Sequence, residues 1–321
     1  MDPTSSAEVA RELHAVLFGT TAELTGPRLA ELTDTDLERD RALWRALGFP
    51  VAADDAMRYS GDDVAALESL DRLIGTGLVD DEVAIRLTRA MGRALAGVAR
   101  SQAEVVEQLA VTAKTDPEDV LRSFAHVVPD IEALLVFVWR RHLVAALAEV
   151  LASDEPGDVS TLAVGFVDVT GYTAMSRTHP PAVVRHVIRT FESRVTDTVA
   201  SYGGRVVSTL GDAVLFTVPD CVTAARLGLD LARLPVGDDD LPPVRVGLAW
   251  GEVVAHHGDV LGSVVNLAAR LCEIARPGTV LIDRDGAALL HGTPDLAVRR
   301  IGRTSVRGYA HLEPWAVRAV T

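Results

Sequence analysis

Apolar residues recur at helical spacing through the first 150 residues of the chain. One such window runs through Val105, Val106, Leu109 and Ala113. Ser60 followed by Asp63 is typical of a capped helix start. Asp116 followed by Pro117, at the first helical position, is typical of another. We therefore predict an all-α domain over residues 1–152.

The pattern changes after a polar segment with Pro and Gly, which we interpret as a linker at residues 153–160. Apolar, β-branched runs then predict strands at 162–169, 205–210, 213–218, 244–250, 279–282 and 314–319. Helical spacing predicts helices at 181–201, 221–234 and 263–275. Strands that alternate with helices, with a hairpin across Gly211 and Asp212, predict a ferredoxin-like α/β sandwich over residues 161–321. The chain as a whole is expected to be α+β.

Composition narrows the class of protein. The 321 residues suffice for two domains, and 48% of them are apolar, as in a well-packed protein. The net charge of −14 argues against nucleic acid as a partner, and with it against a helix-turn-helix reader at residues 48–70. The two cysteines, Cys221 and Cys272, stand in apolar helical contexts and are expected to be reduced.

No membrane span is expected. The most apolar stretch, residues 131–151, is interrupted by Arg140, Arg141 and His142 near its middle, and charges at mid-span are costly in lipid. The start of the chain is polar and acidic rather than apolar. We expect a cytoplasmic protein.

Two carboxylates are the first candidates for chemistry. Asp168 ends an apolar run just before the turn at Gly171, and Asp212 lies at the tip of the expected hairpin. Taken singly, each is explained as a turn residue. A buried carboxylate is costly, however, unless it is paired or holds a cation. Two carboxylates that converge at one sheet edge suit paired Mg²⁺ ions.

The expected helix 263–275 adds a polar face with Asn266, Arg270 and Glu273 at spacings of three and four. A solvated surface is the simplest interpretation of this face. An Asn and an Arg one turn apart also suit contacts to a ribose oxygen and to a phosphoryl oxygen.

Four motifs then follow one another in the chain. They are Phe166-x-Asp168-x-x-Gly171-Tyr172, Gly204-Arg205-Val206-Val207-x-x-x-Gly211-Asp212, Arg245-Val246-Gly247-Leu248-x-x-Gly251 and Asp259-x-x-Gly262-x-x-Val265-Asn266-x-Ala268-x-Arg270. Together they resemble the class III nucleotide cyclase catalytic domain. The resemblance covers residues 161–320, including a closing strand pair at Arg307-Gly308. Each motif alone is weak, but four in order are specific.

The resemblance implies an adenylate cyclase, a lyase of signal transduction. The ribose 3′-oxygen of ATP attacks the α-phosphorus, which gives 3′,5′-cyclic AMP and pyrophosphate. Asp168 and Asp212 are implied to hold two Mg²⁺ or Mn²⁺ ions, one acidifying the 3′-hydroxyl and one gathering the phosphates. Asn266 is implied to position the ribose and Arg270 to stabilise charge on the α-phosphoryl group.

The resemblance also implies a phosphate cradle and a dimer. The cradle consists of the backbone amides of Thr170, Gly171, Tyr172 and Thr173, joined by Arg245. In this family the site forms across a head-to-tail dimer, with the metal carboxylates on one chain and the Asn and Arg on the other. A homodimer with two composite sites is therefore expected.

One position departs from the family pattern. Adenine is read in this family by a Lys four residues before the second metal Asp and by an Asp seven before the Asn. The Asp is present as Asp259, but Ser208 replaces the Lys. Loss of a charge-assisted hydrogen bond costs about 1.5–3 kcal/mol, or roughly ten- to a hundredfold in affinity. ATP remains favoured over GTP with relaxed selectivity, and the alternative is a nucleotide-binding signalling module with little or no turnover.

The first half resembles, less specifically, the N-terminal regulatory domain of mycobacterial-type adenylate cyclases. The similar segments are Leu47-Gly48-Phe49-Pro50 and Tyr59-Ser60-x-Asp62-Asp63-Val64. The resemblance implies control of the cyclase by a small molecule, a lipid or pH through this domain. Trp44 and Trp139 are expected in its core.

Overall fold

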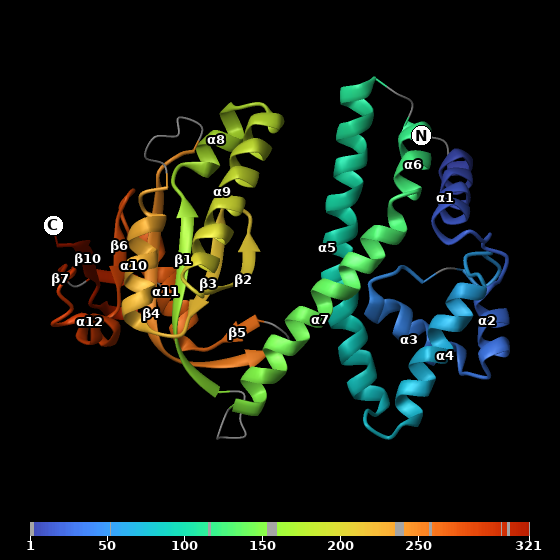
Figure 1. The fold of residues 1–321 in the computed structure, drawn as a ribbon, viewed down its shortest axis with the longest axis horizontal. Helices are drawn as coiled ribbons and strands as arrows, with labels where there is room; N and C mark the ends of the chain where they lie inside the picture. Colours follow the sequence, from blue (N-terminus) through green and yellow to red (C-terminus); the bar gives the residue numbers. More distant parts are fainter. Residues whose placement is uncertain are drawn as a thin grey trace. The chain divides into compact units, whose positions relative to one another are not determined.

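A computed structural model describes residues 3–51, 53–114, 117–152, 159–234, 241–256, 259–302, 304–306 and 309–320. The chain divides into two compact units, residues 1–154 and 155–321 (Figure 1). Most of the expected linker, the cap at Asp116 and residues 307 and 308 of the expected closing strand pair lie outside the described residues.

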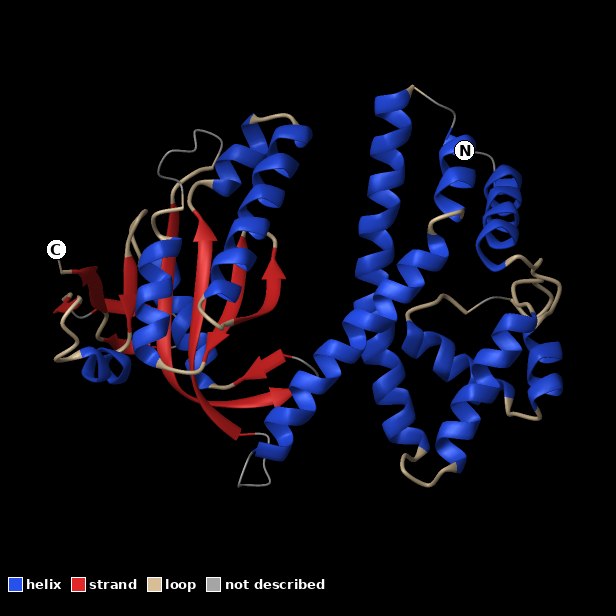
Figure 2. Ribbon diagram, in the orientation of Figure 1, coloured by secondary structure: helices blue, strands red, loops and turns tan. Residues whose placement is uncertain are grey.

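The named elements of the first unit are all helices, as expected (Figure 2). They are α1 (Pro3–Phe18), α2 (Gly26–Thr33), α3 (Leu37–Leu47), α4 (Gly61–Gly75), α5 (Asp81–Ala113), α6 (Pro117–Ala125) and α7 (Val128–Ala152). The helix start predicted at Ser60 is confirmed: Ser60 caps α4, and its backbone N–H donates to Asp63 Oδ2 over 2.7 Å.

A small apolar core joins helices α2 to α4. It contains Leu29, Leu43, Trp44 and Leu67. Helix α5 approaches the end of α3 so closely that a Cβ at Gly92 would lie 2.3 Å from the carbonyl oxygen of Leu47. Gly92 is therefore required by the packing, because only a residue without a side chain fits there.

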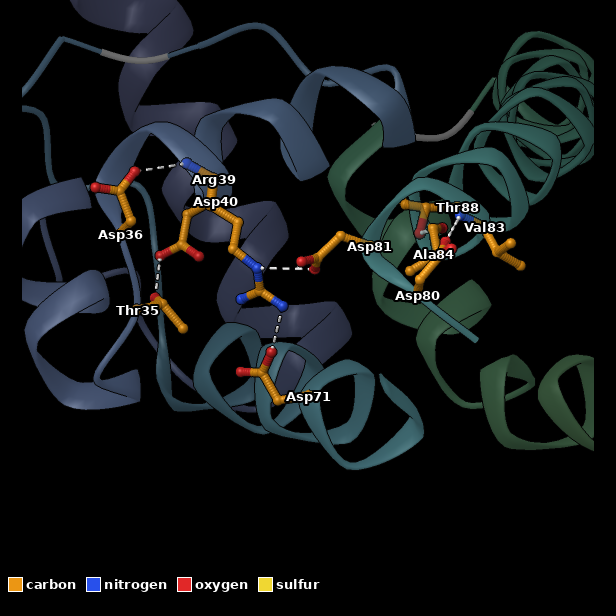
Figure 3. A network of polar contacts seen from close by, with 10 residues as sticks. All are labelled: Thr35, Asp36, Arg39, Asp40, Asp71, Asp80, Asp81, Val83, Ala84 and Thr88. Carbon is orange, nitrogen blue, oxygen red and sulfur yellow. Dashed lines mark hydrogen bonds and ion pairs between the residues drawn. The ribbon is translucent and has the colours of Figure 1, made fainter. Parts of the chain in front are cut away.

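Charged side chains tie the same helices together (Figure 3). Arg39 on α3 donates to Asp71 of α4 over 2.6 Å and to Asp81 of α5 over 3.3 Å. Beside it, buried Asp40 accepts a hydrogen bond from Thr35 over 2.8 Å, and its burial raises the pKa of its carboxyl group. Arg39 thus links α3, α4 and α5 through ion pairs that stay partly exposed. Such pairs contribute at most about 1 kcal/mol each.

The core expectation was right for one Trp and wrong for the other. Trp44 is 8% exposed, whereas Trp139 on α7 is 59% exposed within the single chain. Helix α7 carries apolar residues on all sides, so most of them have no place in the small core of this unit. Within the described residues, no helix is both long and apolar enough to cross a membrane.

The second unit is built on a mixed sheet with strand order β2-β3-β1-β4-β6-β10-β7. Its first elements are β1 (Val159–Val169), α8 (Tyr172–Thr178), α9 (Pro181–Ser201), β2 (Arg205–Leu210), β3 (Ala213–Val218), α10 (Cys221–Leu231) and β4 (Val244–His256). Then follow β5 (Asp259–Leu261), α11 (Ser263–Ile274), β6 (Val280–Ile282), α12 (Arg284–Leu290), β7 (Leu296–Arg300), β8 (Thr304–Val306), β9 (Tyr309–Leu312) and β10 (Trp315–Ala319).

The expected ferredoxin-like sandwich is confirmed. Its elements follow the order β1-α9-β2-β3-α10-β4, and its strands lie side by side as β2-β3-β1-β4, each antiparallel to its neighbours. The hairpin across Gly211 and Asp212 pairs Leu210 with Ala213. Strand β4 continues to residue 256, six residues past its expected end, where it pairs with β5. Short elements without a strong periodicity, such as α8, α12 and β7, were not predicted. Strands β8 and β9 pair with each other on either side of residues 307–308, where a closing strand pair was expected.

Side chains of β1 alternate between two cores. Ala163, Val167 and Val169 join α9 and α10 in one apolar cluster, and Val164 and Phe166 join α11 in the other. Helices α9 and α10 therefore cover one face of the sheet and α11 covers the opposite face. An apolar run without polar alternation is what a strand buried on both faces requires.

A buried carboxylate fastens α12 to the sheet. Asp283, 5% exposed, accepts hydrogen bonds from the backbone N–H of Trp250 over 3.1 Å and of Gly286 over 3.2 Å. Burial raises the pKa of Asp283 to about 6, although the backbone donors favour its ionised form.

This raised pKa predicts a pH-dependent stability. Between about pH 4 and pH 6 the folded chain retains a proton on Asp283 that the unfolded chain releases, so the free energy of unfolding falls as the pH rises. Relative to Asp283→Asn, the wild type should lose about 2–3 kcal/mol across this window and change little above it. Urea unfolding of both proteins from pH 4 to 7 measures the difference. The exposed neighbour in Asp285→Asn serves as control, and a pH-independent difference at position 283 would contradict the prediction.

Candidate active site

Strand pairing brings the two expected metal carboxylates to one edge of the sheet. Asp168, near the end of β1, lies opposite Ala213 of β3, the residue that follows Asp212. The backbone N–H of Val169 donates to the carbonyl of Asp212 over 3.0 Å. The two residues, 44 positions apart in the chain, are therefore held together by the β1-β3 ladder.

Asp168 is nearly buried, with a side chain 13% exposed. Burial is the largest influence on its carboxyl group and raises the pKa; Arg245 opposes this, and the neighbouring Asp212 carboxylate adds to it. The net pKa of Asp168 is raised. A positive charge that binds between the two carboxylates would offset the desolvation cost of the buried Asp168 carboxylate. It would also reduce the repulsion between the two negative charges.

Arg245 provides a positive charge for Asp168 within the chain. It lies opposite Asp168 in the β1-β4 ladder and donates from Nε to Asp168 Oδ2 over 2.7 Å. Its Nη1 donates to the backbone carbonyl of Glu273, at the end of α11, over 2.6 Å. The side chain assigned to the terminal phosphates thus links β1, β4 and α11.

The turn after β1 has the backbone expected of a phosphate cradle. Gly171 has φ of +79° and caps α8, which begins at Tyr172 without a side-chain cap. The first amides of a helix have no intrahelical partner, so they can meet an anion. Thr170 differs, because both its N–H and its Oγ1 donate to the carbonyl of Pro243, over 2.8 and 2.5 Å. Of the four backbone amides expected in a phosphate cradle, that of Thr170 is therefore already bonded within the chain.

Helix α11 presents the Asn and the Arg from the opposite face of the sheet from α9. Asn266 is exposed, and Arg270 is half-buried and pairs with Glu273, Nη1 to Oε2, over 2.6 Å. The helix lies directly on β4, since a Cβ at Gly247 would be 2.1 Å from Cys272 N and 2.4 Å from Ala268 O. The absence of a side chain at Gly247 therefore sets how closely α11, with Asn266 and Arg270, approaches the sheet.

The two positions expected to read the base lie on two strands that are in contact. Strands β2 and β5 are in contact, and they carry Ser208 and Asp259. Ser208 is half-buried and follows a bulge in the β2-β3 ladder. Asp259 is exposed, and its carboxylate accepts a hydrogen bond from the N–H of Val260 over 2.8 Å. The bulge turns local side chains away from regular alternation, so the sequence alone did not fix where position 208 points.

Glu273 is the residue whose importance the sequence signalled only weakly. Its carboxylate holds Arg270 and its carbonyl holds Arg245. The spacing of three from Arg270 was visible in the sequence, but the carbonyl contact depends on a neighbour 28 residues away.

Comparison with known families identifies this unit. The family model of the adenylate and guanylate cyclase catalytic domain matches residues 155–319, about half of the chain. The chain belongs to this cyclase family. The resemblance drawn from the four motifs is confirmed, and with it a cyclase function for the chain in general terms.

Relatives extend the comparison beyond the cyclase domain. The chain is 30% identical to an adenylate cyclase of Glutamicibacter nicotianae, over 99% of the chain and 84% of the relative. It is 32% identical to an adenylate cyclase of Streptomyces coelicolor, over 89% of the chain and 77% of that protein. The helical first half is therefore shared with proteins that carry the adenylate cyclase name.

Solved cyclase structures match about half of the chain. The adenylyl cyclase CyaB from P. aeruginosa is 19% identical, with a TM-score of 0.46, over 52% of this chain and 98% of that one. The guanylate cyclase domain of RhGC from Catenaria anguillulae, in complex with GTP, is 22% identical with a TM-score of 0.46, over 50% and 97%.

The donor set of the cyclase unit fits a divalent cation of the Mg²⁺ type. Among the described residues no group of three or more His, Cys, Asp and Glu side chains forms a metal cluster. Asp168 and Asp212 nevertheless supply carboxylate oxygens, the ligands that hard cations prefer, and Mg²⁺ binds through one or two carboxylates with the substrate phosphates completing its shell. The Arg245 guanidinium already holds positive charge at this point.

Proposed function

We propose that the chain is an adenylate cyclase that converts ATP to 3′,5′-cyclic AMP and pyrophosphate. The observation that carries the proposal is the meeting of Asp168 and Asp212 at one sheet edge, beside the glycine turn that opens α8. Relatives named adenylate cyclase support ATP as the nucleotide.

The carboxylates and Arg245 prepare the site for a charged substrate. Two Mg²⁺ or Mn²⁺ ions bound by Asp168 and Asp212 would supply Lewis acidity at the ribose 3′-hydroxyl and neutralise phosphate charge. Before substrate binds, Arg245 balances the charge of Asp168. On binding, it exchanges this partner for the terminal phosphates, next to the amides of Gly171, Tyr172 and Thr173.

Asn266 and Arg270 complete the site from α11. Asn266 orients the ribose, so that its 3′-oxygen faces the α-phosphorus in line with the leaving pyrophosphate. Arg270 leaves Glu273 and donates to the α-phosphoryl oxygens as charge develops there. Glu273 thus acts as the resting partner that keeps this guanidinium in place.

A homodimer with composite sites accounts for the exposure of these groups. Asn266 and Asp259 lie on the surface of the single chain, whereas Asp168 is nearly buried. Polar residues that catalyse a reaction must be shielded from water when they act. A second copy of the chain, with the sheet edge that carries Asp168 and Asp212 placed over α11, would shield these groups. By symmetry, the dimer would contain two such shielded sites.

The base pocket supports adenine with relaxed selectivity. The Asp259 carboxylate can accept from the adenine amino group, whereas guanine would present an acceptor oxygen to it. Ser208 is too short to replace a Lys at this position unless water bridges the gap. A nucleotide-binding module with little turnover remains the second candidate, and Ser208 is the observation that favours it.

The helical first unit is proposed to control the cyclase. It contains a cavity of about 230 Å³, lined by the aromatic side chains of Phe18, Trp44, Phe49 and Tyr59 together with Arg58. This cavity favours a small molecule as the input. Helix α7 leads from this unit into the segment before β1, and a composite site is sensitive to any change in subunit orientation.

Turnover and subunit complementation test the mechanism together. With Mn²⁺ and ATP, the purified chain should form cyclic AMP, and Asp168→Ala and Arg270→Ala should each reduce kcat by about 100-fold or more. Mixed one to one, the two inactive chains should regain about a quarter of the wild-type activity, because half of the dimers then carry one intact site.

The exposed acid in Asp197→Ala on α9 is the matched control and should retain full activity. Absence of product at every pH from about 5 to 8, from folded protein, would leave the binding-module alternative. Activity without complementation would refute the cross-chain site alone.

Restoring the missing base contact should sharpen selectivity. Ser208→Lys is expected to raise kcat/KM for ATP by about tenfold or more, the value of one charge-assisted hydrogen bond, and to leave GTP turnover nearly unchanged. Steady-state kinetics with both nucleotides measure the ratio. Thr209→Lys on the same strand is the control, and an equal gain from both variants would show a general charge effect instead.

Removal of residues 1–154 tests the role of the helical unit. The shortened chain, with folding checked by circular dichroism, should differ from the full chain in cyclase rate by at least about threefold, since coupling of 1 kcal/mol or more is usual between linked sites. Identical rates and identical pH profiles would remove the first unit from the account of regulation.

A further inference from the structure

The second unit has a pocket of about 370 Å³ at the edge of the sheet opposite to β2. It lies over strands β6, β10 and β7. Arg299 of β7 and Leu281 of β6 are both paired with Ala316 of β10, so these three side chains project to one face of the sheet. Leu281 and Ala316 pack with α11, which identifies this face as the α11 face.

The pocket exists because α11 ends early. The helix packs on β1, β4 and β6 and stops at Ile274. The outer strands β10 and β7 extend beyond it, and their α11 face forms the floor. That floor is apolar and includes Ile274, Leu281 and Ile301.

Three arginines surround this apolar floor. They are Arg276 after α11, Arg299 on β7 and Arg318 on β10, and all three are exposed. No acidic side chain of the described residues pairs with them. The next residue along, Arg300, pairs with Glu313 over 2.8 Å and projects to the other face of β7. The chain as a whole has a net charge of −14 and therefore repels anions. The three arginines make this pocket a local region of positive charge.

We propose that this pocket binds a small phosphate monoester with an apolar, ring-sized body. Planar guanidinium groups match phosphate oxygens in two-pronged hydrogen bonds, and three of them suit a group that carries two negative charges. The apolar floor suits the body of the ligand. A dry cavity of about 150 Å³ already holds benzene, so the volume suffices for a ring and its phosphate.

The pocket is separate from the proposed catalytic residues. Asp168 lies on β1 and Ser208 on β2, towards the other end of the strand order, and none of the three arginines belongs to the proposed phosphate cradle. The binding proposal therefore does not depend on cyclase activity. An occupant would touch Ile274 and Arg276, which follow the Glu273 carbonyl that holds Arg245.

Phenyl phosphate is a suitable probe, because it combines a dianion with one ring. Calorimetric titration of the full chain should show binding that weakens as salt is raised from about 50 to 300 mM. Arg299→Gln and Arg318→Gln should each weaken it by about tenfold, and the double variant should abolish it. Arg300→Gln, on the same strand and facing the other way, should leave it within about twofold.

Two further probes test the phosphate contact and the apolar contact separately. Inorganic phosphate should bind more weakly than phenyl phosphate, and benzyl alcohol should not bind detectably. Equal binding of the two phosphates would refute the apolar half. Absence of binding to the wild type, or unchanged binding to a double variant that retains its thermal midpoint, would overturn the site. Ala316→Leu, which fills the floor, gives a second variant: it should reduce binding of phenyl phosphate more than that of phosphate.

Discussion

The burial of β1 on both faces is the constraint on which the cyclase unit depends. Val167 belongs to one core and Phe166 to the other, so the strand cannot shift by one residue without reversing both sets of contacts. The register of β1 also fixes the position of its end, where Asp168 lies. A carboxylate at the end of a doubly buried strand is costly unless positive charge meets it. The Arg245 guanidinium does so in this structure, and a divalent cation is proposed to share that role.

The same constraint makes the position of the site depend on the register of the sheet. Asp168 and Arg245 come from the adjacent strands β1 and β4, and Asp212 comes from the turn that joins β2 to β3, beside β1. Core packing sets the registers of these strands. Helix α11 adds its polar residues through backbone contact at Gly247. Sites built on strands and packed helices hold their geometry better than sites on loops. What can change in this site is the set of partners of its side chains. Arg245 and Arg270 both pair with acids of the chain, and both are proposed to exchange these acids for phosphate oxygens.

The first unit follows a different physical plan. Its core is small, and a charged network around Arg39 joins α3, α4 and α5. Partly exposed ion pairs of this kind contribute less stability than apolar packing does. Much apolar surface of α7, including Trp139, stays exposed in the single chain. A ligand that binds one arrangement of such a unit better than another shifts its population, which is what the proposed regulation requires.

The sequence by itself determined the class of each half, the ferredoxin-like order of strands and the family. Buried strands are visible as continuous apolar runs, and the motifs are recognised from the spacing of their residues. It did not reveal α8, α12 or β7, which are too short to show a period. It misjudged Trp139, because helical spacing does not say which helices receive a partner. Only the tertiary structure placed Arg245 on Asp168, turned the Thr170 amide to Pro243 and gathered Arg276, Arg299 and Arg318 around one hollow. These contacts join residues far apart in the chain, and the register of the sheet decides them.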